Sequence, residues 1–170
     1  MLAVIKIIIV NMVSNIYLNS TLRNIDGWRG VFAADTIPIN PFTSPQSKPQ
    51  FVIVNTSPIR DSDGHWVLLS KYSESGNTVL EVFDSYGWPL SSLHQNIQTV
   101  LLTVKFDFLL TNNQNIQHIQ SNYCGLFTIA RIVSILRSES LQKHLSLYSA
   151  NLSKNNQRCI DYIRTVSQRL

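Results

Sequence analysis

Residues 65–84 read HWVLLSKYSESGNTVLEVFD, and this stretch predicts the core of the fold. Two apolar runs flank a short polar segment that contains Gly76-Asn77. A glycine–asparagine pair between two such runs is typical of a β-hairpin turn. We therefore expect two antiparallel strands, with His65 opening the first and Asp84 closing the second. The start of one strand then lies beside the end of its partner, so these two side chains can meet.

The segments around this hairpin predict a mixed α+β domain. Four prolines between residues 37 and 50 indicate an extended surface loop, and Ser14 is the expected N-cap of a first helix. The run GLFTIARIVSIL at residues 125–136 is apolar on nearly every side, which is typical of a buried helix. We expect strands at 51–55, 65–72, 78–84 and 104–110, and helices at 15–26, 89–102, 125–136, 141–147 and 160–166. The expected architecture is a mostly antiparallel sheet packed by helices.

The composition fits one folded domain that needs no cofactor. The 170 residues correspond to about one domain, and an apolar fraction of 44% with 14% charged residues argues against disorder. The net charge of +4 is spread over single Lys and Arg residues, so only weak, non-specific nucleic-acid binding is permitted. The sequence contains no cluster of metal ligands and no glycine-rich phosphate loop, so we expect no cofactor and no metal.

The first 13 residues, MLAVIKIIIVNMV, differ from the rest of the chain by their apolar character. The run is too short for a membrane-spanning helix, which needs about 20 apolar residues, so we expect no membrane association. A signal peptide is a competing interpretation, but no basic segment precedes the run and no small-x-small cleavage site is evident. We expect an apolar leader or helix of unassigned role at residues 1–13 and a single domain at residues 14–170.

Cys124 lies in a context suited to nucleophilic chemistry. It falls between a polar segment and the apolar run of residues 125–136, which places it at or near a helix N-terminus. Backbone N–H groups and the helix dipole stabilise a thiolate there, and nearby amides can stabilise an oxyanion. A cysteine nucleophile needs a base, which His65 can supply, and Asp84 can fix the tautomer of that base. Each of the three residues alone is more often structural, so it is their combination that indicates catalysis.

Four segments of the chain carry a resemblance to a known family. They are WRGVFAADTIP at residues 28–38, DGHW at residues 63–66, VFDSYG at residues 82–87, and the stretch from Gln117 through SNYCGLF at residues 121–127. Together they resemble the adenain-like proteases of adenoviruses, small DNA viruses and virus-like mobile elements, a family related to the SUMO-specific (ubiquitin-like) proteases. The resemblance covers roughly residues 14–136 and implies a papain-like cysteine protease fold.

The resemblance also implies a role for each site residue. It implies that His65 is the general base and that Cys124 is the nucleophile. It also implies that Asp84 orients the imidazole and that Gln117 donates its side-chain amide to the oxyanion. The family places its glutamine six or seven residues before the cysteine, which favours Gln117, although Gln114 and Gln120 compete for this role. Two residues complete the expected substrate-binding part: Trp66, which packs beside the histidine, and Gly125, which lets the substrate backbone approach because it has no Cβ.

The chain departs from the adenovirus enzymes at its second cysteine. Those enzymes are activated by a viral peptide that forms a disulfide with a cysteine upstream of the nucleophile. Here the other cysteine, Cys159, lies on the C-terminal side, so activation by that covalent route is not expected. We expect Cys159 to be a half-buried residue of a C-terminal helix. The two cysteines indicate neither a disulfide framework nor a zinc site and fit a reducing, intracellular setting.

Two classes of function follow from these features. The first is an endopeptidase that processes viral or element-encoded capsid precursors, and its alternative within the enzyme class is the removal of a ubiquitin-like modifier such as SUMO. The second is a non-catalytic descendant that keeps the fold as a binding module. For the enzyme we expect a protein substrate (a capsid precursor or a ubiquitin-like conjugate), a monomer, and a location in the cytoplasm, the nucleus or the virion.

Overall fold

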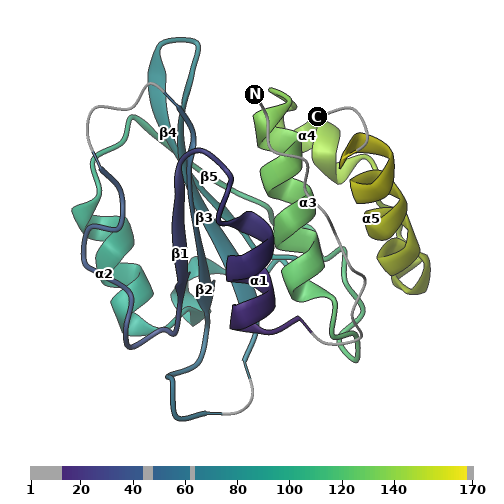
Figure 1. Cartoon of the computed structure of the whole chain (residues 1–170), viewed down its shortest axis with the longest axis horizontal. Helices are drawn as coiled ribbons and strands as arrows, with labels where there is room; N and C mark the ends of the chain where they lie inside the picture. The colour runs from purple at the N-terminus through teal and green to yellow at the C-terminus, as the bar shows by residue number, and fades with distance from the viewer. Residues whose placement is uncertain (1–12, 44–47, 62–63, 168–170) are drawn as a thin grey trace.

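The computed structural model describes residues 13–43, 48–61 and 64–167 (Figure 1). The expected leader lies outside the described residues except for Val13, which is buried. A central five-stranded sheet has the strand order β1-β2-β3-β4-β5. The strands are β1 (Trp28–Phe32), β2 (Gln50–Asn55), β3 (Trp66–Glu74), β4 (Asn77–Phe83) and β5 (Phe108–Thr111). Within the described part of the chain, no helix is long and apolar enough to cross a membrane.

The expected hairpin is present and forms the centre of the sheet. β3 and β4 pair antiparallel, with Leu68 opposite Phe83, up to the turn that joins them. The turn is centred on Ser75 and Gly76, one residue earlier than expected, and both have positive φ angles, 51° and 83°. Positive φ at both central positions is characteristic of the type I′ turn, whose twist matches that of the flanking strands.

The sheet is mixed rather than mostly antiparallel, which corrects the expectation from the sequence. β2 pairs antiparallel with β3, but β1 pairs parallel with β2, and β4 pairs parallel with β5. A parallel pair needs a crossover connection because the chain must return to the same end of the sheet. The proline-rich connection between β1 and β2 is one crossover, and the short 3-10 helix η1 (Leu90–Ser92) followed by α2 (Gln95–Thr103) is the other.

Helices cover both faces of the sheet (Figure 1). α2 lies on one face, while α1 (Asn15–Leu22) and α3 (Cys124–Leu136) lie on the other, with α4 (Leu141–Leu145) and α5 (Leu152–Ser167) beyond α3. Strand side chains alternate between the faces, so that Leu68 packs into the larger apolar cluster with α3 and Val67 into the smaller one with α2. α3 is buried along nearly its whole length, as expected. Ser14 is the N-cap of α1, because its Oγ accepts a hydrogen bond from the Tyr17 N–H at 3.1 Å.

Cys159 is fully buried, which corrects the expectation of a half-buried residue. The reason is that α5 begins at Leu152, eight residues earlier than expected, and packs this side chain into the apolar cluster beside α3. Burial raises the pKa of the Cys159 thiol to about 12, although a hydrogen bond with Tyr148 opposes the rise. This cysteine is therefore an inert part of the core at neutral pH.

A buried ion pair connects the sheet to α3. Glu81 on β4 and Arg131 on α3 are almost fully buried and share two hydrogen bonds of 2.7 Å, from Nε to Oε1 and from Nη2 to Oε2. The Tyr72 hydroxyl donates a third bond of 2.7 Å to Oε2 of Glu81. A bidentate pair of this kind fixes orientation as well as distance. It therefore helps to set where Cys124, the first residue of α3, lies against the sheet.

Candidate active site

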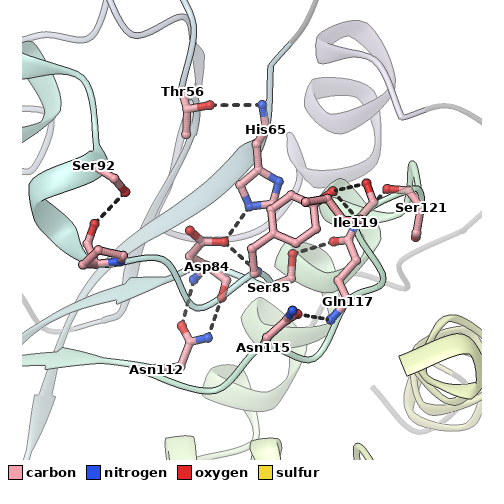
Figure 2. A network of polar contacts seen from close by, with 12 residues as sticks. Thr56, His65, Asp84, Ser85, Ser92, Asn112, Asn115, Gln117, Ile119 and Ser121 are labelled. Atoms are coloured by element: carbon pink, nitrogen blue, oxygen red, sulfur yellow. Dashed lines mark hydrogen bonds and ion pairs between the residues drawn. The ribbon is translucent and has the colours of Figure 1, made fainter. Parts of the chain in front are cut away.

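The β3–β4 hairpin brings His65 and Asp84 together at its open end. His65 immediately precedes β3 and Asp84 immediately follows β4. The imidazole Nε2 donates a hydrogen bond of 2.6 Å to the Asp84 carboxylate, Oδ1 (Figure 2). Both side chains are buried, with 5% of His65 and 3% of Asp84 exposed. The antiparallel register thus produces the contact that the sequence pattern led us to expect.

Asp84 is held in place by its own hydrogen bonds. Its Oδ1 also accepts a bond of 2.8 Å from the Tyr86 N–H. Asn112, which follows β5, binds the Asp84 backbone on both sides (Figure 2): the Asp84 N–H donates to Asn112 Oδ1 at 2.8 Å, and Asn112 Nδ2 donates to the Asp84 carbonyl at 2.5 Å. The parallel pairing of β4 with β5 brings Asn112 into this position. Sequence reasoning missed its role, because Asn112 has the appearance of an ordinary turn residue.

Cys124 lies at the start of α3, beside His65. Cys124 and His65 line the same cleft, and 9% of Cys124 is exposed. The second imidazole nitrogen, Nδ1, is buried and has no hydrogen-bond partner of normal geometry among the described residues. The Cys124 thiol does interact electrostatically with the ring. One imidazole nitrogen, Nε2, is therefore bonded to a carboxylate. The other nitrogen, Nδ1, remains available to exchange a proton with the thiol or a substrate.

The protonated form of His65 is stabilised by its neighbours. Burial alone would lower the pKa of His65, but the hydrogen bond and charge of Asp84 and the interaction with Cys124 outweigh it and raise the pKa to about 9. At neutral pH the ring is therefore an imidazolium. A positive charge beside the sulfur favours the thiolate form of a cysteine, which is the nucleophilic form.

Two aromatic rings surround the imidazole. The Tyr86 ring stacks on His65 with centroids 4.2 Å apart and an interplanar angle of 26°, and the Trp88 ring lies 5.7 Å away. Faces of aromatic rings attract a cation, so both residues fit a charged imidazole. Neither residue was singled out from the sequence, although both follow Asp84 within four positions in the segment DSYGW.

Gln117 is close to the other site residues but is engaged in the loop that precedes Cys124. Its Nε2 donates a hydrogen bond of 2.6 Å to the Ser121 carbonyl and makes a longer contact of 3.4 Å with the Tyr86 hydroxyl. Its Oε1 accepts a bond of 2.5 Å from Ser85 Oγ (Figure 2). Gln117 is fully buried, whereas its competitors Gln114 and Gln120 are exposed. Its role as the oxyanion donor stays a prediction.

The cleft that contains Cys124 has a volume of about 580 Å³. Trp66 also lines it. Gly125 does not face open space, because a Cβ added there would lie only 2.4 Å from Cγ1 of Val13. The space beside this glycine is thus filled by the protein itself. In the described part of the chain, no three His, Cys, Asp or Glu side chains are arranged to hold a metal ion.

Comparison with known proteins identifies the fold. No family model matches the chain, and no curated protein matches it. A crystal structure of the ASFV pS273R protease matches with a TM-score of 0.61 at 16% identity, covering 88% of this chain and 66% of that chain. Its selenomethionine form gives a TM-score of 0.46 at 20% identity over 65% of this chain and 43% of that one. The Legionella pneumophila effector protein RavZ gives 0.35 at 16% identity over 72% and 44%.

The chain therefore has the α+β fold of the ASFV pS273R protease. It spans 43% and 66% of the two crystallised forms of that protease. The structural similarity covers 88% of this chain at 16% sequence identity, so it establishes the fold and not the activity.

Proposed function

We propose that this chain is a cysteine endopeptidase, with Cys124 as the nucleophile, His65 as the general acid and base, and Asp84 as the group that orients the imidazole. The observation that carries the proposal is the pairing inside one cleft of a cysteine at a helix start with a histidine whose Nε2 is bonded to a buried carboxylate. The fold shared with the ASFV pS273R protease is compatible with it.

In this mechanism, the Cys124 thiolate attacks the carbonyl carbon of the scissile peptide bond. A C–S bond forms and the carbonyl electron pair moves onto oxygen. The tetrahedral intermediate then collapses: the C–N bond breaks, and the His65 imidazolium gives its proton to the departing amine. Water attacks the resulting thioester, neutral His65 takes a proton from that water, and the C–S bond breaks. The products are a carboxylic acid and the original thiolate–imidazolium pair.

Two donors can stabilise the oxyanion in this mechanism. The first is the backbone N–H at the start of α3, because N–H groups in the first turn of a helix have no partner within the helix. The second is the side-chain amide of Gln117. One of its N–H groups is engaged by the Ser121 carbonyl at 2.6 Å, so the group that makes only the long contact with Tyr86 at 3.4 Å is the one available to the oxyanion.

The proposed substrates are capsid precursor proteins of a virus or a virus-like element. This choice comes from the family resemblance in the four sequence segments. The cleft is open to solvent and bounded by both apolar and polar side chains, which suits an extended, flexible segment of a precursor. We further propose that the enzyme acts as a monomer in the cytoplasm or nucleus or in the virion.

A cleavage panel tests this proposal. Capsid-precursor peptides and ubiquitin-like conjugates are incubated with wild type, Cys124→Ala and, as a matched control, Cys159→Ala. Peptide cleavage that is lost in Cys124→Ala and kept in Cys159→Ala supports a maturation peptidase. Cleavage confined to the conjugates would assign the chain to the deconjugating enzymes instead. If the wild type cuts neither substrate, the binding-module alternative replaces the enzyme.

A further inference from the structure

Val13 lies directly against the residue that follows the nucleophile. A Cβ built on Gly125 would lie 2.4 Å from Val13 Cγ1, 2.9 Å from Val13 Cβ and 3.4 Å from Trp66 Cδ1. Real Cβ atoms do not approach other carbons so closely, so position 125 must be glycine for Val13 to occupy this place. Val13 is 5% exposed and belongs to the larger apolar cluster.

Val13 also binds Trp66, the neighbour of His65. The Trp66 indole N–H donates a hydrogen bond of 3.0 Å to the Val13 carbonyl, across a separation of 53 residues in sequence. Trp66 is the first residue of β3 and follows His65 directly. One residue at the entry of α1 therefore contacts both chain segments that carry the proposed catalytic pair.

The same residue forms part of the cleft wall. Val13, Ser14 and Asn15 line the cleft together with His65 and Cys124. Ser14 caps α1, which fixes the direction in which the chain leaves Val13. A side chain that only filled the core would not need to contact the cleft, the start of α3 and the start of β3 at the same time.

We propose that Val13 is a positioning residue: its side chain and carbonyl hold the first turn of α3, at Cys124 and Gly125, and Trp66 in the positions that bring the thiol of Cys124 to the imidazole of His65. This inference rests on the proposed cysteine-peptidase chemistry. Without the isopropyl group, both segments can relax toward the vacated space, and the thiol of Cys124 is held less firmly beside the imidazole. Misplacement of a catalytic group by about 1 Å is enough to cost on the order of 100-fold in rate.

The experiment measures alkylation of Cys124 by iodoacetamide as a function of pH, because this rate reports the thiolate–imidazolium pair without any substrate. Cys159 does not compete, since it is fully buried and its pKa is raised to about 12. The variants are Val13→Ala and Trp66→Phe, which keeps an aromatic ring but deletes the indole N–H. The matched control is Val79→Ala. Val79 is 2% exposed in the same apolar cluster, but it lies on β4 opposite Tyr72, toward the turn end of the hairpin.

We expect Val13→Ala to slow alkylation at neutral pH by at least about tenfold and to lower kcat more than it raises KM. Trp66→Phe should give an effect of the same direction, whereas Val79→Ala should lose stability without slowing alkylation. Equal alkylation rates for Val13→Ala and Val79→Ala would overturn the inference, as would a rise in KM alone, which would make Val13 a substrate contact. If wild-type Cys124 itself reacts no faster than an ordinary thiol, the proposed function fails rather than the role of Val13.

Discussion

Replacing Asp84 with asparagine tests how the protein keeps His65 protonated. The new amide side chain would retain an oxygen that accepts the bonds from His65 Nε2 and the Tyr86 N–H, which are 2.6 and 2.8 Å long in the native protein. The substitution removes the negative charge. An opposite charge at this distance shifts a pKa by about 1 to 3 units, equivalent to about 1.4 to 4 kcal/mol. Burial, which lowers the pKa of His65, would then be opposed mainly by the interaction with Cys124.

The sign of the effect follows from the direction of the shift. In the wild type the imidazolium persists until the pH rises through about 9, so we expect kcat/KM to fall above that pH. In Asp84→Asn the alkaline limb should move to lower pH by about 1 to 3 units. The variant should also lose about 1 to 3 kcal/mol of stability. The reason is that Asp84 Oδ2 has no hydrogen-bond partner among the described residues, and an NH₂ group placed there would be an unsatisfied buried donor.

The assay combines a pH–rate profile from pH 5 to 11 with an NMR titration of the imidazole. The His65 signal is assigned by its absence in His65→Gln. His144 is an internal reference, because burial and the charge of Arg131 lower its pKa to about 3 and it should not titrate in this range. An alkaline limb at the same pH in wild type and Asp84→Asn would refute the reasoning, provided that urea unfolding shows both proteins to be folded.

Two further predictions concern the packing of α3 and the oxyanion. Glu81→Gln should destabilise the protein by about 3 to 5 kcal/mol in urea unfolding, because it leaves Arg131 buried without its partner charge. Lys48→Ala, which removes an exposed pair with Asp26, should cost far less stability because solvent screens that pair, and equal losses in the two variants would contradict this account. Gln117→Ala should lower kcat by on the order of 100-fold with little change in KM, whereas the exposed Gln120→Ala should leave kcat unchanged. A wild-type kcat in Gln117→Ala would assign that side chain to the loop alone.

The central hairpin and the His65–Asp84 pair were predictable because both depend on local pattern. Two apolar runs around a turn fix the register, and the register brings the residue before one strand to the residue after the other. The burial of α3 followed in the same way from a run without a polar face. For β3, β4 and α3 the expected bounds differ from the observed ones by no more than two residues.

Other features depend on contacts that no local pattern contains. β1 was missed because Gly27 and Gly30 look like strand breakers, whereas their φ angles of 84° and 126° allow a tight approach to Pro49 and an irregularity within the strand. Asn112 and Val13 reach the site from 28 and 53 residues away in sequence. In the sequence, Asn112 looks like an ordinary turn residue and Val13 like part of an apolar leader. Only the folded structure shows that Asn112 binds the Asp84 backbone and that Val13 binds Trp66.

The most direct test of the account is to trap the covalent intermediate. The protein is mixed with an activated peptide ester, quenched with acid within the first turnover, and examined by intact mass and peptide mapping. The account predicts one acyl group per chain, attached to Cys124, in the wild type and in Cys159→Ala, and none in Cys124→Ala. Hydrolysis of the ester without any acyl group on Cys124, or an acyl group on another residue, would contradict it.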